Sequence, residues 1–133
     1  MKRYLIPTVY MTLIFISSSV PMDKEIKGLE FVMKIDPGLQ NLLHIPVYAL
    51  LAFLWFKSFS HSKYSIKIIV LLSFLIALAY GIVNEFYQLL IPGRYFSLSD
   101  ILFNFIGVFL GCLLVIFLRR GPIKVPPHEF RCR

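Results

Sequence analysis

The sequence predicts an all-α membrane protein, a bundle of four transmembrane helices in two hairpins with both termini in the cytoplasm. Of the 133 residues, 58% are hydrophobic and 16% are charged. With a mean hydropathy of +0.76, the chain is too apolar for a soluble domain of this size. Four apolar runs hold most of the hydrophobic residues, and Lys and Arg lie at the ends of these runs. The net charge of +7 therefore indicates membrane topology rather than nucleic-acid binding.

The first apolar run, residues 4–20, follows a short basic N-terminus and is either a transmembrane helix or a signal peptide. The three serines at 17–19 resemble the small residues of a cleavage site, but Pro21 disfavours cleavage. At 17 residues the run is near the lower limit for spanning a bilayer. We favour a retained, slightly short helix, and in either case the following loop lies outside.

Residues 21–41 mix charged side chains with apolar ones at helical spacing. This pattern fits a short helix in the membrane interface as well as an ordinary solvated loop. Pro37-Gly38 ends either structure in a turn.

Three further spans are predicted over residues 42–56, 66–90 and 98–118. Pro46 is tolerated in the first turn of its helix, whose first amides lack intrahelical partners. The run 66–90 would measure ~37 Å as a helix, more than the ~30 Å hydrocarbon layer, so its end must tilt or protrude.

The last span begins after a turn at Pro92-Gly93, where Ser97 and Asp100 are spaced as in a capping box. The four spans make one domain, residues 1–120. Residues 121–133 contain three prolines and are expected to form a disordered, basic cytoplasmic tail.

The orientation follows from the distribution of positive charge. With the N-terminus inside, the cytoplasmic side holds ten Lys and Arg residues and the outer side holds four, Lys24, Lys27, Lys34 and Arg94. Because cytoplasmic loops collect Lys and Arg, both termini are predicted to lie inside. The start of the second span, the end of the third and the start of the fourth then meet at the outer surface.

Polar residues gather where these ends meet. Glu85 and Gln88 follow Gly81 at i+4 and i+7, and Asn104, Gly107 and Gly111 follow Asp100 at i+4, i+7 and i+11, so each helix has one polar and small-residue stripe. Gly81, Gly107 and Gly111 are interpreted as helix-packing positions, since glycines let neighbouring helices approach closely. We expect a shared ligand-binding pocket formed by His44, Tyr48, Glu85, Gln88, Arg94, Asp100 and Asn104.

Other readings of these residues remain open. Glu85 can pair with Arg94, and the positive end of its own helix can stabilise Asp100. His44, Glu85 and Asp100 are also candidate catalytic groups, although no nucleophile motif accompanies them. The same three residues are conceivable metal ligands, but no HExxH-type spacing supports this, so neither a metal nor another cofactor is predicted. Cys112 and Cys132 belong to lipid and water respectively, so no disulfide is expected.

The stretch 81–111, GIVNEFYQLLIPGRYFSLSDILFNFIGVFLG, together with HIPVYALL at 44–51, resembles the VanZ-like family of small bacterial membrane proteins. The family pattern has Glu and Gln closing one helix, then Pro, Gly and Arg, and Asp, Asn and two Gly opening the next. These positions are Glu85, Gln88, Pro92, Arg94, Asp100, Asn104, Gly107 and Gly111, with His44 and Tyr48 in the earlier segment. Gln40 and Asn41 stand where the family often has an Asp-Lys pair.

The resemblance implies a multi-pass protein of the bacterial cytoplasmic membrane. The family takes its name from a protein linked to resistance to teicoplanin, a glycopeptide that acts on cell-wall precursors outside that membrane. The expected partners are therefore membrane lipids, a lipid-linked wall precursor or a glycopeptide, with Arg94 holding an anion. The alternative is an enzyme that modifies such a lipid with His44 and Glu85 or Asp100. A transporter is less favoured, because four helices without a polar path conduct little unless the chain forms homo-oligomers.

Overall fold

The computed structural model describes residues 2–21 and 41–119 as four α-helices joined by turns and loops. The helices are α1 (Lys2–Ser18), α4 (His44–Phe59), α5 (Ile66–Gln88) and α6 (Leu98–Arg119). The all-α prediction is confirmed, and the described ranges contain no strand. The predictions for most of the 21–41 loop and for the tail 121–133 concern residues outside the described ranges.

Two of the four helices are long and apolar enough to cross a membrane. They are α5, with 23 residues, and residues 98–118 of α6, with 21. Only 22% and 33% of these spans are buried inside the protein, whereas the core helix of a soluble protein is mostly buried. The 17 residues of α1 and 16 of α4 give helices of only ~24–26 Å, so the structure supports two spans by length and leaves the four-span topology a prediction.

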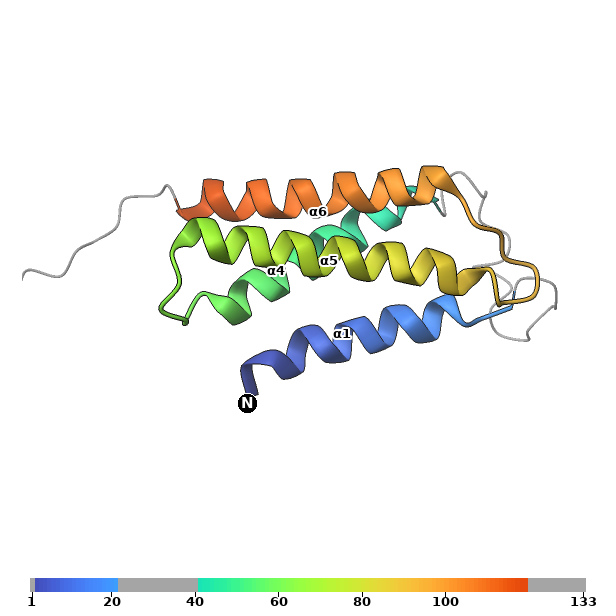
Figure 1. Cartoon of the computed structure of the whole chain (residues 1–133), viewed down its shortest axis with the longest axis horizontal. Helices are drawn as coiled ribbons and strands as arrows, with labels where there is room; N and C mark the ends of the chain where they lie inside the picture. Colours follow the sequence, from blue (N-terminus) through green and yellow to red (C-terminus); the bar gives the residue numbers. More distant parts are fainter. Residues whose placement is uncertain (1, 22–40, 120–133) are drawn as a thin grey trace, which may run out of the picture.

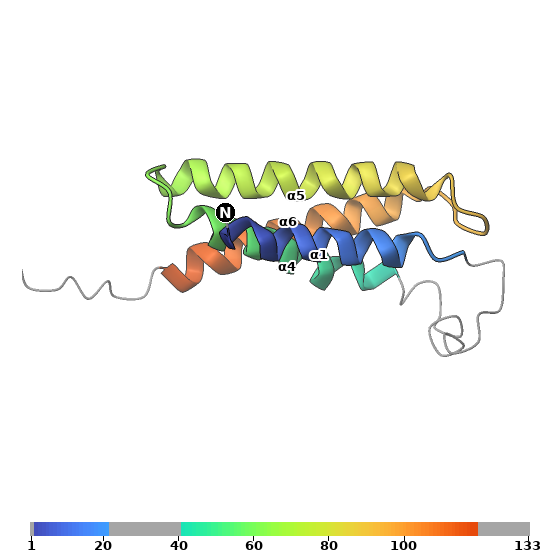
Figure 2. The same cartoon turned by 90° about the horizontal axis from the view of Figure 1, so that it is seen from below.

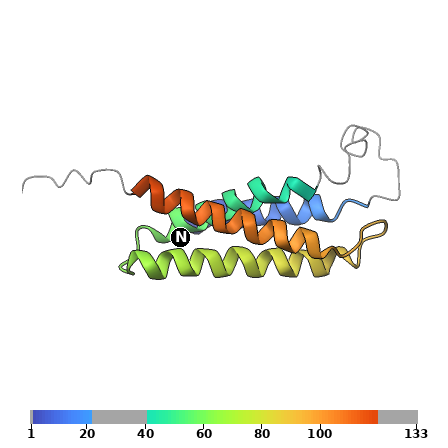
Figure 3. The same ribbon diagram turned by 90° about the horizontal axis from the view of Figure 1, so that it is seen from above.

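The helices form an elongated bundle in which α5 and α6 lie side by side and α4 crosses them obliquely (Figures 1 and 3). α4 packs most extensively against α6, while α1 contacts α4 and α5 but not α6. The view from below shows α1 on the outside of this assembly (Figure 2). The start of α1 and the end of α6 lie at one end of the bundle, and the starts of α4 and α6 lie at the other (Figure 1).

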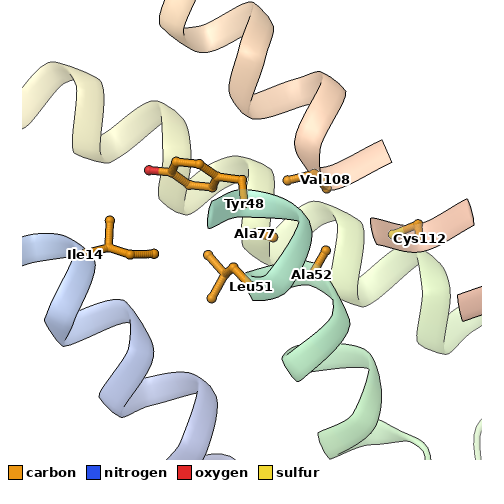
Figure 4. Close-up of a cluster of buried hydrophobic side chains, with 7 residues drawn as sticks. All are labelled: Ile14, Tyr48, Leu51, Ala52, Ala77, Val108 and Cys112. Carbon is orange, nitrogen blue, oxygen red and sulfur yellow. The ribbon is translucent and has the colours of Figure 1, made fainter. Parts of the chain in front are cut away.

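The core is centred on α4, which contacts all three other helices. Seven buried side chains from all four helices meet there: Ile14, Tyr48, Leu51, Ala52, Ala77, Val108 and Cys112 (Figure 4). Cys112 is a free thiol. A smaller cluster of Phe56, Ile69 and Val115 lies toward the α4–α5 connection. Many other large apolar side chains of α5 and α6 are exposed, among them Leu71, Leu102 and Phe117, where lipid would cover them.

Glycines set the close contact between α4 and α6. A Cβ atom added at Gly107 would overlap the backbone carbonyl of Ile45, and one at Gly111 would overlap that of Ala49. At Gly81 an added Cβ would instead meet side chains, 3.0 Å from Tyr48 Cε1 and 3.1 Å from Asn104 Nδ2. The α4–α6 contact is therefore made between backbones, which leaves no room for side chains at these two positions.

Candidate functional site

Four of the predicted site residues meet where α4 begins, α5 ends and α6 begins. His44 is the first residue of α4, Glu85 lies in the last turn of α5, and Asp100 and Asn104 occupy the first two turns of α6. Residues four apart share a helix face, so Asp100 and Asn104 point to the same side. We call His44, Glu85, Asp100 and Asn104 the polar cluster.

The two carboxylates of the polar cluster lie out of solvent. Glu85 is 0% exposed and Asp100 is 7% exposed, whereas the side chain of His44 is 21% exposed. His44 Nδ1 lies 3.7 Å from Glu85 Oε1. One imidazole nitrogen and one oxygen of each carboxylate all lie within 4.8 Å of one another. An ionised carboxylate is costly to bury without a partner, so this arrangement needs a compensating charge, proton or ligand.

Hydrogen bonds hold the polar cluster in place from two sides. His44 Nδ1 and Asn104 Oδ1 are 2.8 Å apart, and Gln88 Nε2 donates to Glu85 Oε1 at 3.2 Å. The Gln88 side-chain oxygen accepts from Arg94 Nη1 at 3.4 Å. One oxygen of Glu85 and one side of the imidazole ring are thereby fixed.

Several polar atoms at this end of the bundle have no hydrogen-bond partner within the part of the chain that the structure describes. They are Glu85 Oε2, Asp100 Oδ1, Asn104 Nδ2 and the hydroxyl of Tyr48. Within these ranges none of them makes a hydrogen bond of ordinary geometry, although Asn104 lies near Glu85, Asn84 near Tyr48 and Ser97 near Asp100. An unsatisfied buried polar group costs about 1–3 kcal/mol, more when it is charged. Acceptors and donors are both present, so the polar cluster can receive a ligand that has both.

Tyr48 lies one helical turn after His44 on α4. The two rings are stacked, with centroids 6.0 Å apart, and Tyr48 is 1% exposed. Its ring belongs to the hydrophobic core (Figure 4). Tyr48 therefore closes the polar cluster off from the apolar interior.

Arg94 interacts mainly with α1 rather than with the polar cluster. Its Nε donates to the carbonyl of Val20 at 3.0 Å, and its Nη2 donates to that of Ser17 at 2.9 Å. Among the described residues, no ion pair joins Arg94 to Glu85. The basic side chain within ion-pair distance of Glu85 is His44. Burial lowers the pKa of the Arg94 guanidinium from its usual value, and the neighbouring Glu85 carboxylate opposes that shift. The arginine therefore ties backbone carbonyls at and just beyond the end of α1 to the α5–α6 connection.

Sequence reasoning missed a second set of polar contacts, which joins α1 to α5. Asn84 Nδ2 donates to Ser18 Oγ at 2.9 Å, and the hydroxyls of Ser19 and Tyr87 are 3.0 Å apart. Ser18 and Ser19, two of the three serines that resemble a cleavage site in the sequence, supply these contacts. Their polarity at the end of an apolar run was the available signal.

The role of Arg94 can be tested by stability. Arg94→Ala is expected to destabilise the protein by about 2 kcal/mol, because hydrogen bonds from a charged donor contribute more than neutral ones. Arg94→Lys should recover only part of the lost stability, since an ammonium group cannot reproduce the planar, forked hydrogen bonding of a guanidinium. Thermal unfolding in detergent measures both, with Tyr95→Ala, at a neighbouring residue that is 84% exposed, as the control. Equal melting of Arg94→Ala and Tyr95→Ala would contradict the assignment.

Comparison with known proteins adds a family relationship. A family model described as VanZ/LLP1 matches residues 3–119. The match includes every residue of the polar cluster and nearly all of the four helices. No curated protein and no solved structure gives a significant match.

Proposed function

The chain belongs to the VanZ/LLP1 family, and from that premise we propose that its polar cluster binds the head group of a membrane amphiphile at the outer leaflet. The observation that carries the proposal is the set of buried, unpartnered atoms at one end of a bundle with two long apolar helices. Buried polar groups are normally satisfied. A ligand with hydroxyl or amine donors and at least one acceptor would satisfy them.

The surroundings of the polar cluster favour an amphiphile over a freely soluble molecule. The turn just after α5 and the start of α6 expose Leu89, Leu90 and Leu98, which would contact acyl chains. The polar cluster would bind the polar head group of an amphiphile, and the exposed leucines would contact its apolar tails. Phospholipids, lipid-linked wall precursors and lipoglycopeptides all have this form.

The side of the membrane follows from charge. The four Lys and Arg residues assigned to the outer side, against ten inside, favour an outer position for the α5–α6 connection. A multi-pass protein of the bacterial cytoplasmic membrane with this orientation presents the polar cluster where cell-wall precursors and teicoplanin occur. A contribution to teicoplanin resistance is the cellular consequence we propose.

Retained lipid tests the proposal. Wild-type protein purified in mild detergent should keep an amphiphile that native mass spectrometry detects, and Glu85→Gln should reduce its retention about tenfold, the equivalent of ~1.4 kcal/mol. Glu85→Gln conserves shape and removes the charge. Ser73→Ala is the matched control, because Ser73 is also buried on α5 but bonds to the carbonyl of Ile69.

Head-group binding and the role in teicoplanin resistance can each be ruled out by a separate result. Equal lipid retention by wild type, Glu85→Gln and Ser73→Ala would rule out head-group binding at the polar cluster. Equal teicoplanin susceptibility of a sensitive host carrying wild type, Glu85→Gln or empty vector would rule out the resistance role.

A second candidate function is catalysis on a lipid or lipid-linked precursor. It is supported by the 3.7 Å separation of His44 Nδ1 and Glu85 Oε1, which is longer than a hydrogen bond but short enough to tighten into an acid–base pair when a substrate binds. Lipid profiles of cells with wild type and with His44→Ala separate this from binding alone. Identical profiles count against an enzyme.

A further inference from the structure

Three residues of the polar cluster have the side chains that bind metal ions, and each comes from a different helix. One nitrogen of His44 and one oxygen each of Glu85 and Asp100 lie within 4.8 Å of one another. Around a tetrahedral zinc ion with bonds of ~2.0–2.1 Å, ligand atoms lie ~3.3–3.5 Å apart. The 3.7 Å between His44 Nδ1 and Glu85 Oε1 is slightly longer than that spacing, and the 4.8 Å limit on the three atoms leaves at most ~1.5 Å for side-chain rotations to close.

The negative charges of the Glu85 and Asp100 carboxylates also favour the binding of a cation. Glu85 and Asp100 are both more than nine-tenths buried, and each has one oxygen without a hydrogen-bond partner. Arg94 interacts electrostatically with Glu85, but its guanidinium is hydrogen-bonded to carbonyls of Ser17 and Val20 and forms no ion pair with either carboxylate among the described residues. Two buried carboxylates around an imidazole repel each other unless a cation or proton neutralises them.

We propose that His44, Glu85 and Asp100 bind one divalent metal ion per chain. The mixture of one imidazole and two carboxylates fits zinc best, since calcium and magnesium prefer oxygen ligands alone. Three protein ligands leave at least one coordination position for a ligand or water, as in catalytic rather than structural zinc sites.

Neighbouring amides support the ligands in the way that metal sites require. Gln88 Nε2 donates to Glu85 Oε1 at 3.2 Å, and Asn104 Oδ1 lies 2.8 Å from His44 Nδ1. An ion bound at His44 Nδ1, the nitrogen 3.7 Å from Glu85 Oε1, would replace the bond to Asn104, whereas an ion at Nε2 would keep it; the bond from Gln88 to Glu85 is kept in both cases. Outer partners of this kind orient metal ligands and raise affinity.

Metal binding is a property separate from head-group binding, and a bound ion would change the charge that the polar cluster presents to a head group. A divalent ion would offset the two carboxylates and give the polar cluster an attraction for phosphate or another anion. Metal content is measured without lipid, and lipid retention without added metal, so each proposal can fail alone.

The test uses the full chain purified with a tag that contains no histidine. After chelator treatment, zinc titrated into the wild-type protein should bind at about one ion per chain and raise the melting temperature, with magnesium much weaker. Asp100→Asn and Glu85→Gln should each weaken zinc binding about tenfold or more. The control replaces histidines elsewhere in the chain, His61→Ala with His128→Ala, and should bind zinc as wild type does.

Two outcomes overturn the site. The first is wild-type protein that binds no zinc and shows no rise in melting temperature at about 1 mM, a concentration that detects even weak sites. The second is zinc binding that survives in Asp100→Asn and Glu85→Gln but disappears in the histidine control. The wild-type titration decides the first point even where a variant fails to accumulate.

Discussion

Gly107→Ala and Gly111→Ala are each expected to destabilise the protein by about 3 kcal/mol, at the upper end for overpacking. The added Cβ would overlap the backbone of Ile45 or Ala49, and backbone cannot move aside as a side chain can. α4 would have to shift away from α6, which is its most extensive contact. Because His44 lies at the start of α4 and Asn104 on α6, the shift would also disturb the polar cluster.

Thermal unfolding in detergent, with retained lipid measured in parallel, tests this expectation. Leu110→Ala is the matched control, because Leu110 neighbours Gly111 but is exposed. Gly81→Ala should cost less, since its Cβ meets the side chains of Tyr48 and Asn104, which can rotate. If Gly107→Ala had the same melting temperature as Leu110→Ala, the packing of α4 on α6 would not depend on this close contact.

His44→Ala is expected to destabilise metal-free protein by about 3 kcal/mol, because two buried polar groups, the carboxyl of Glu85 and the amide of Asn104, each lose the imidazole as a polar partner, at ~1–3 kcal/mol per group. Glu85 would lose the imidazole 3.7 Å from its Oε1, and Asn104 would lose its 2.8 Å bond. Unfolding in mixed detergent micelles gives the free energy. His61→Ala, in the exposed α4–α5 connection, is the control and should have little effect.

A double-mutant cycle separates the electrostatic part of this loss. Adding Glu85→Gln to His44→Ala removes the uncompensated charge, so the double variant should be more stable than the sum of the single losses by about 1 kcal/mol or more. Strictly additive losses would mean that His44 and Glu85 do not interact, and the polar cluster would then lose its central contact.

The part of the fold set by local pattern could be predicted from the sequence. The apolar runs gave the helices of the α4–α5–α6 segment, and Pro92-Gly93 gave the turn, where Gly93 has a φ of 76° that favours glycine. Helical periodicity placed Glu85 on one stripe and Asp100 and Asn104 on another. The structure brings these stripes together with His44.

Contacts to backbone atoms were beyond sequence reasoning. Arg94 binds the carbonyls of Ser17 and Val20, and Gly107 packs on that of Ile45. Every residue has such a carbonyl, so no side chain marks the partner. His44, Glu85 and Asp100 are conceivable metal ligands from the sequence, but their scattered positions provide no local spacing that predicts a site, and they meet only when α4, α5 and α6 pack.

The proposals for the outer leaflet depend on which side of the membrane holds the polar cluster, and cysteine labelling in spheroplasts measures this directly. In a background without Cys112 and Cys132, Tyr95→Cys reports the α5–α6 connection and His61→Cys the α4–α5 connection; both native residues are exposed. An impermeant maleimide should label Tyr95→Cys at once and His61→Cys only after permeabilisation. Labelling of His61→Cys in sealed spheroplasts, with Tyr95→Cys protected, would place the polar cluster in the cytoplasm and contradict the account.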